Sequence, residues 1–170
     1  RHVIPAFFPP GELITVEISD GVKDIITLKT NPQCKPFDGE NPSNQQRLNN
    51  PQLTYQLKNT VNTIGTPYGG SCSVHVTTDD PIDIIFSGVI LQPYFYYGMT
   101  SDEEWENDLS QRPGPFAYLD TGNLVHLMPA NSEVRSSYRM NDCMKYWRSS
   151  VQISQTTALD YVGYGNSRFG

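Results

Sequence analysis

The stretch Tyr68–Val76 constrains the fold of this chain more than any other. Two glycines, Gly69 and Gly70, end a turn-forming run and lead directly into a segment whose apolar residues recur at every second position from Cys72 to Val76. A period of two predicts a strand that is buried on one face. The paired glycines predict a structural turn in which the backbone needs conformational freedom or another backbone approaches closely.

Strand-like segments lie on both sides of this stretch. Residues 12–18 and 25–30 alternate in the same way and are separated by an Asp-Gly turn signal, so we expect them to pair as a hairpin or meander. The most apolar run, residues 82–91, predicts a buried strand that bends at Gly88. Thirteen glycines, thirteen prolines and 37% hydrophobic residues favour a loop-rich β domain over a helical bundle. The chain is therefore predicted to be mainly β, with a jelly-roll-like β-sandwich over residues 1–138.

Helix is expected only in the second half of the chain. Ser101 and the acidic residues after it predict a short helix near 101–109. A longer helix is predicted near 141–162, with Asn141 as its N-cap. Its apolar stripe predicts an interface helix, with the contacts made by Met144, Trp147 and Val151. Residues 139–170 are accordingly assigned to a helical segment that leads away from the sandwich.

Charge and composition exclude several classes of partner. A net charge of −6 argues against nucleic acid or an anionic membrane surface as the main partner. No apolar stretch approaches the roughly 18 residues that span a membrane. Cys34, Cys72 and Cys143 leave two alternatives open, one disulfide or three buried free thiols.

The sequence contains no recognisable catalytic motif. Its three histidines, His2, His75 and His126, are far apart, and none has a second metal ligand at helical spacing. Each is best interpreted as a strand histidine satisfied by a neighbour or by water. We therefore predict no catalytic residue, no metal ligand and no cofactor within these 170 residues.

An aromatic cluster is the best candidate for binding. Alternation places Tyr94 and Tyr96 on one side of a strand and Phe95 and Tyr97 on the other, so one pair belongs to the core and one faces outward. Exposed tyrosines stack on sugar rings or anchor protein interfaces. The predicted binding residues are Tyr94, Tyr96, Tyr97 and Trp105.

The order of several short motifs resembles the N-terminal part of the M60-like, enhancin-type metallopeptidases, a family that also contains non-peptidase relatives. The matching pieces are residues 9–16, Arg47, Gly69-Gly70, residues 93–100 with Trp105, residues 115–119 and Tyr146-Trp147. The resemblance implies a β-sandwich that precedes a zinc-dependent catalytic domain acting on glycoproteins such as mucins. The family's zinc motif, His-Glu-x-x-His with a later glutamate, would follow the long helix, so no catalytic residue is carried over. This chain departs from the family at Arg148, where an aspartate is usual, and at residues 71–73, which replace an apolar run.

Two functional hypotheses follow. In the first, the chain is a non-catalytic accessory domain of an extracellular or cell-surface M60-like zinc metallopeptidase, and its partner is the remainder of that protein. In the second, it is a stand-alone module that binds glycans or proteins and has no peptidase activity. A hydrolase with its site inside this chain is disfavoured, because zinc-dependent cleavage needs a metal with an open position and a base beside it.

Overall fold

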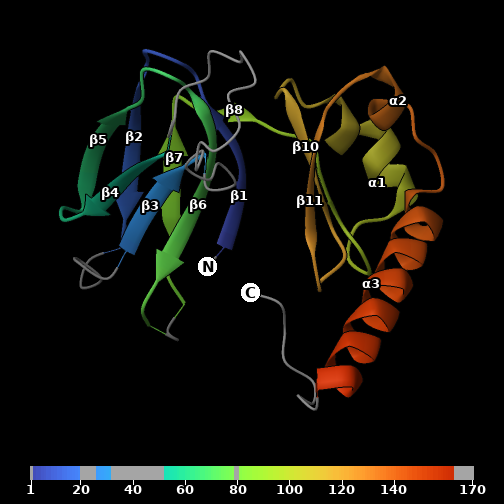
Figure 1. Ribbon diagram of the computed structural model, residues 1–170. Coiled ribbons are helices and arrows are strands. Elements are labelled where there is room, and N and C mark those ends of the chain that lie inside the picture. The colour runs from blue at the N-terminus through green and yellow to red at the C-terminus, as the bar shows by residue number, and fades with distance from the viewer. Residues whose placement is uncertain (1, 20–25, 32–51, 79–80, 163–170) are drawn as a thin grey trace, which may run out of the picture. The chain divides into compact units, whose positions relative to one another are not determined.

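The computed structural model describes residues 2–19, 26–31, 52–78 and 81–162, and the chain forms two compact units, Arg1–Ile90 and Leu91–Gly170. Figure 1 shows that strands dominate the first unit and that the helices belong to the second. The prediction of a mainly β, sandwich-like fold with a short and a long helix late in the chain is confirmed.

The first unit is built from two β-sheets. One has the order β4-β3-β6-β1-β8 and the other has the order β5-β2-β7. Their strands are β1 (His2–Phe8), β2 (Leu13–Ile18), β3 (Ile26–Thr30), β4 (Leu53–Leu57), β5 (Val61–Gly65), β6 (Gly70–Val76), β7 (Ile84–Ser87) and β8 (Ile90–Leu91). The expected hairpin between residues 12–18 and 25–30 is wrong, since β2 pairs with β5 and β7 whereas β3 pairs with β4 and β6. Apart from β3 and β4, which pair in the same sheet, consecutive strands of this unit alternate between the two sheets.

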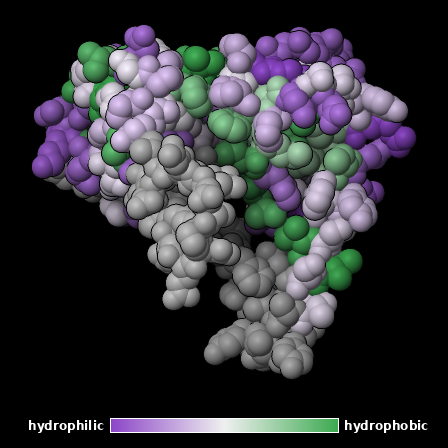
Figure 2. Space-filling model, turned by 45° about the horizontal axis from the view of Figure 1, so that its top comes forward, coloured by the Kyte–Doolittle hydropathy of each residue, from purple (hydrophilic) through white to green (hydrophobic). Residues whose placement is uncertain are grey.

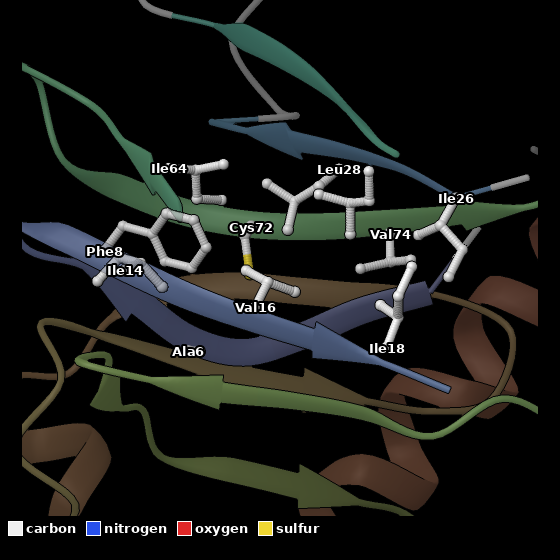
Figure 3. Packing of buried hydrophobic residues seen from close by; sticks show 11 residues of the cluster. Ala6, Phe8, Ile14, Val16, Ile18, Ile26, Leu28, Ile64, Cys72 and Val74 are labelled. Atoms are coloured by element: carbon white, nitrogen blue, oxygen red, sulfur yellow. The ribbon is translucent and has the colours of Figure 1, made fainter. Parts of the chain in front are cut away.

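Alternating side chains from both sheets form the core of this unit. Ile14 and Val16 of β2 are fully buried, as are Leu28 of β3 and Cys72 of β6. Figure 3 shows the labelled apolar side chains of β2, β3 and β6 meeting in one layer. Each fully buried side chain of this size contributes roughly 1.5–3 kcal/mol through removal of apolar surface from water.

The central strand β6 was predicted to be buried on one face, and the structure buries its polar face as well. Ser71 and Ser73 are buried as deeply as the apolar residues that alternate with them, so β6 is buried on both faces over most of its length. Alternation reveals which residues share a face. It does not reveal what covers the polar face.

The glycine turn before β6 is constrained as expected. Gly69 has a φ of +63° and Gly70 a φ of +134°, a region that side chains with a Cβ rarely adopt. A Cβ at Gly69 would lie 2.8 Å from the carbonyl oxygen of Phe8, and one at Gly70 would overlap the side-chain amide of Asn31. That amide donates a hydrogen bond of 2.9 Å to the carbonyl of Gly69. The turn is therefore tied to β1 and to the end of β3.

The second unit packs helices against a small mixed sheet. The sheet has the order β11-β10-β9, with β10 parallel to β9 and antiparallel to β11. Its elements are β9 (Tyr94–Tyr96), α1 (Asp102–Asn107), the 3-10 helix η1 (Leu109–Gln111), β10 (Phe116–Asp120), β11 (Val125–Pro129), α2 (Ser132–Arg135) and α3 (Met140–Val162).

The second unit has a core of its own. Phe95, Trp105, Met140 and Met144 are buried in a single cluster together with Ala117 and Leu119 of β10. Because the first turns of α3 supply part of this core, the helix belongs with β9–β11. The boundary between the two compact units accordingly lies at Ile90/Leu91, whereas the sequence analysis drew one at 138/139.

The starts of α1 and α3 are linked by one carboxylate. Ser101 and Glu104 form a capping box at α1, which lowers the pKa of Glu104 through the hydrogen bonds from Ser101. The neighbouring Asp102 accepts a 2.8 Å hydrogen bond from the backbone N–H of Asn141. Asn141 thus lies inside α3 and does not cap it, and an acidic side chain from α1 satisfies this N–H.

Candidate functional site

The four aromatic residues predicted to bind a ligand have different environments. Trp105 is completely buried, packs edge-on against Phe95 with ring centroids 5.8 Å apart, and donates its indole N–H to the carbonyl of Ser137 at 3.1 Å. With its ring in the core and its only donor in use, Trp105 has no surface on which a sugar or peptide could stack. The sequence around Trp105 did not indicate this burial, because a helix as short as α1 shows no repeat of apolar residues that would identify its buried face.

Tyr94 and Tyr96 lie on the sheet face opposite the buried Phe95, as the alternation predicts. Their rings are partly exposed, with centroids 6.5 Å apart and planes tilted by 36°. The Tyr94 hydroxyl donates to a carboxylate oxygen of Asp120 at 3.3 Å. Burial, followed by the charge of Asp120, raises the pKa of Tyr94 to about 12. We call this surface, together with Arg148, the tyrosine face. Tyr97, by contrast, is partly buried and packs against the core cluster that contains Phe95.

Asp120 is a member of the tyrosine face that sequence reasoning missed. It faces Tyr96 in the parallel register of β9 and β10, and its second carboxylate oxygen accepts the N–H of Gly122 at 2.7 Å. Only the pairing of β9 with β10 brings this carboxylate to the tyrosines, and no local pattern in the sequence indicates a parallel pair separated by a helix.

Arg148 of α3 reaches the same end of the sheet. Its guanidinium carbon lies 5.5 Å from the centre of the Tyr97 ring, a cation–π distance. A Cβ at Gly122 would lie 3.8 Å from the Tyr96 hydroxyl and 4.0 Å from an Arg148 guanidinium nitrogen. The tyrosine face therefore combines aromatic rings, phenol hydroxyls, a carboxylate and a guanidinium. Such a set can hydrogen-bond and stack, and it contains no activated nucleophile.

The predicted interface helix divides into two parts. Met144 is fully buried in the core of the second unit, whereas Trp147 is 45% exposed and Val151 is partly exposed. Tyr146 and Ile153 are about 70% and 67% exposed, respectively, and Figure 2 shows hydrophobic residues reaching the surface along this helix. Between Tyr146 and Ile153, α3 thus presents apolar side chains that the described residues do not cover.

His126 of β11 packs against this helix. Its ring centre lies 5.0 Å from that of Trp147, and its Nε2 atom is buried without a hydrogen-bond partner in the described part of the chain. Of the two partners expected for His126, a neighbour or water, no neighbour among the described residues bonds Nε2. His75, on the exposed part of β6, lines a hollow together with side chains of β3 and β4.

The described residues do not fit the zinc site of a metallopeptidase. Within them, no group of three or more His, Cys, Asp or Glu side chains is placed to hold a metal ion.

Cys72 is a buried free thiol whose pKa burial raises to about 12, and Cys143 is an exposed free thiol. These two cysteines form no disulfide, and Cys34 lies outside the described residues. Over the same residues, no helix is both long and apolar enough to cross a membrane.

Comparison with known proteins gives matches along nearly the whole chain. A family described as "N-terminal domain of M60-like peptidases" matches residues 5–85, and one described as "Peptidase M60, enhancin and enhancin-like" matches residues 88–162. The two matches follow the division into two compact units.

Among curated proteins, antigenic protein P1 of Entamoeba histolytica is 28% identical over 173 aligned residues, which cover 91% of this chain and 15% of that protein. TRPM8 channel-associated factor 3 of Rattus norvegicus is 31% identical over 78 residues, which cover 44% of this chain and 8% of that protein. The chain thus spans a small fraction of the length of these relatives.

Solved structures give the same fold. The M60 catalytic domain of ZmpC from Clostridium perfringens, in complex with the sialyl T antigen, has a TM-score of 0.64 and 18% identity, with 98% of this chain and 36% of that chain covered. The ZmpB metallopeptidase from the same organism has a TM-score of 0.61 and 13% identity, with 89% and 34% covered. The sandwich, the mixed sheet and the long helix, taken with the two consecutive family matches, show that this chain belongs to the M60-like, enhancin-type peptidase family.

Proposed function

We propose that this chain is the N-terminal part of an M60-like zinc metallopeptidase that acts on glycoproteins. The observation that carries the proposal is the succession of the two family matches, since an M60-like N-terminal domain at 5–85 is followed directly by the start of an M60 peptidase domain at 88–162. In this proposal the first unit is a non-catalytic accessory domain that supports the peptidase domain and helps to present substrate.

The middle of α3 supports the presence of further structure. Its apolar residues Trp147 and Val151 follow the buried Met144 at intervals of three and four residues and so continue the stripe that begins there. An amphipathic helix buries such a stripe against a partner. We assign that role to the remainder of the peptidase domain, because the chain covers only about a third of the solved M60 chains, 36% and 34%.

The chemistry of catalysis would come from that remainder. A bound zinc ion polarises a peptide carbonyl and activates a water molecule. The described residues do not supply its ligands. They would instead hold the glycoprotein, and the tyrosine face offers stacking surfaces and hydrogen-bonding groups of the kind that bind sugar rings. An extracellular or cell-surface location is part of the same proposal, because glycoproteins of the mucin type are found there.

The test is to express the longer protein and assay cleavage of a mucin-type glycoprotein with and without a chelator. We expect cleavage that the chelator abolishes and added zinc restores, and no cleavage by the 170-residue chain alone. A longer protein without chelator-sensitive cleavage, or a coding sequence that stops soon after Gly170, would contradict the proposal.

A second candidate function is a stand-alone module that binds glycans or proteins. The observation in its favour is the match to TRPM8 channel-associated factor 3, whose name describes association with a channel. A glycan array combined with sizing of the purified chain tests this alternative. Specific retention of a glycan, or a stable oligomer, by a product without peptidase activity would favour it, whereas a monomer that binds nothing would count against it.

A further inference from the structure

The tyrosine face contains a cation without an acidic partner in the described part of the chain. Arg148 is exposed, and none of the ion pairs among the described residues involves it. Its guanidinium carbon lies 5.5 Å from the centre of the Tyr97 ring. A guanidinium held over a ring loses less side-chain freedom on binding an anion than a lysine that moves freely in water. Arg148 is therefore well positioned to bind a carboxylate.

A gap between Arg148 and Tyr96 has room for such a group. Gly122 has no side chain, and a Cβ there would lie 3.8 Å from the Tyr96 hydroxyl and 4.0 Å from a guanidinium nitrogen of Arg148. Apart from the glycine and its chain neighbours, no other atom of the described residues would come within 4 Å of that Cβ. The hydroxyl and the guanidinium both donate hydrogen bonds, so the two oxygens of one carboxylate can accept from both at once.

Asp120 brings a negative charge close to this gap. Its two carboxylate oxygens accept the Tyr94 hydroxyl at 3.3 Å and the Gly122 N–H at 2.7 Å. These two hydrogen bonds fix the carboxylate, but its charge still opposes an anion in the gap. Removing the charge of Asp120 should therefore strengthen the binding of an acidic ligand, whereas removing the charge of Arg148 should weaken it.

The two tyrosines indicate the form of the ligand. The ring centroids of Tyr94 and Tyr96 lie 6.5 Å apart, and alternate residues of an extended peptide lie about 6.6 Å apart. An extended peptide can therefore place two side chains of one side over successive rings. Gly122 follows Asp120, the register partner of Tyr96, so the gap lies at the Tyr96 end of this row. The next side chain on the same side of the peptide then points to the gap.

We propose that the tyrosine face binds an extended acidic segment of the substrate polypeptide, with an Asp or Glu side chain in the gap between Arg148 and Tyr96. The strand-like spacing of the two rings favours a peptide over a sugar ring, which would stack on one of them. The identity of this peptide as substrate rests on the proposed function, whereas the binding itself requires only the described residues.

The experiment titrates the ¹⁵N-labelled 170-residue chain with the peptide acetyl-Leu-Ser-Pro-Ser-Glu-Ser-Pro-Ser-Leu-amide and with its Gln analogue. Its alternate residues place apolar side chains on both sides of the Glu, so either chain direction fits the row of rings. We expect saturable backbone amide shifts with the Glu peptide, centred on β9, β10 and the turn at Gly122. The Gln peptide should bind about tenfold more weakly, the loss expected when one charge-assisted contact becomes neutral.

Three variants separate the charges. Arg148→Gln should weaken binding of the Glu peptide about tenfold and change binding of the Gln peptide less than about twofold, because only the Glu peptide loses an ion pair. Asp120→Asn should strengthen binding of the Glu peptide about two- to fivefold. Lys145→Gln is the matched control, because Lys145 is an exposed cation of the same helix outside the tyrosine face, and it should change the affinity less than about twofold. Thermal melts check that each variant is folded.

Equal binding of the Glu and Gln peptides, equal losses for Arg148→Gln and Lys145→Gln, or weaker binding by Asp120→Asn would overturn the proposal. A titration with 3′-sialyllactose distinguishes a peptide from an acidic glycan. Shifts of the same amides at equal or higher affinity would assign the face to a glycan and would also overturn the proposal. The titrations need neither zinc nor the longer protein, so failure of peptide binding and failure of the cleavage assay are separate results.

Discussion

At the scale of single residues, Arg135 of α2 joins two backbone segments of the second unit, residues 110–114 and Ala130. Its guanidinium donates to the carbonyls of Ser110, Arg112, Gly114 and Ala130 at 2.6–2.9 Å. A planar guanidinium can serve so many acceptors in fixed directions, whereas a lysine cannot. No sequence pattern indicated this role, because the four carbonyls belong to backbone that any residue could provide.

We predict that Arg135→Met lowers the free energy of unfolding by about 2–3 kcal/mol, because it leaves several partly buried carbonyls without a donor. Arg139→Met is the control, since Arg139 is exposed and its partner among the described residues is the exposed Asp142, and it should cost less than about 1 kcal/mol. Urea denaturation measures both. Equal effects would show that the Arg135 hydrogen bonds contribute nothing specific.

A second prediction concerns Gly69. Gly69→Ala would place a Cβ against the backbone of Phe8 at a positive φ, whereas Gly98→Ala has a similar φ of +84° and open space around it. The strain of φ alone is about 1–2 kcal/mol, and the close contact at Gly69 should add about 1–3 kcal/mol. Thermal melts of the two variants separate these effects. A Gly69→Ala variant as stable as Gly98→Ala would mean that the turn relaxes freely.

The two described cysteines should differ in reactivity. The pKa of Cys72 is raised by burial from 9.0 to about 12, whereas Cys143 is exposed. At pH 8 a thiol reagent should modify Cys143 of the folded protein quickly and Cys72 only after unfolding. The raised pKa also makes the free energy of unfolding depend on pH, because the Cys72 thiol ionises at a lower pH in the unfolded chain than in the folded protein. The stabilisation that results from this pKa difference is complete below pH 9 and is lost as the pH rises toward 12. Comparable modification rates for Cys72 and Cys143 would contradict the buried position.

At the scale of elements, the local sequence pattern predicted where strands and helices lie but did not predict which strands pair. Alternation located β2, β3 and β6, and capping signals located α1, because each depends on residues close in the sequence. The exchange of consecutive strands between two sheets and the parallel pairing of β9 with β10 depend on contacts far apart in the chain, and periodicity carries no information about them. For the same reason Trp105 was assigned to a binding surface when it fills a core.

Helix α3 offers a prediction at this scale. Met144→Ala should cost about 2–5 kcal/mol, the usual range for a fully buried methionine. Trp147 is 45% exposed, so Trp147→Ala should cost less, about 1–2 kcal/mol. Tyr146→Ala, at a 70% exposed position, is the control and should be close to neutral. In the longer protein, a covered α3 would raise the cost of Trp147→Ala toward that of Met144→Ala. An unchanged cost would argue against docking of this helix.

At the scale of the whole molecule, the chain joins a unit that matches the N-terminal domain of M60-like peptidases to a unit that matches the M60 peptidase family, and we propose an accessory role for the first. Family membership could be predicted from the order of short motifs, and the division at Ile90/Leu91 could not, because the strands after it look no different in sequence from those before it. The central claim is that the described residues provide scaffold and binding surfaces, while the catalytic metal belongs to the remainder of a longer protein.

The most direct measurement of that claim is zinc content after equilibrium dialysis, determined by elemental analysis for the 170-residue chain and for the longer protein. The account predicts one zinc ion per longer chain and none retained by the 170 residues. Stoichiometric zinc on the 170-residue chain, lost on substitution of His75 or His126, would contradict it, and so would a longer protein that binds no zinc.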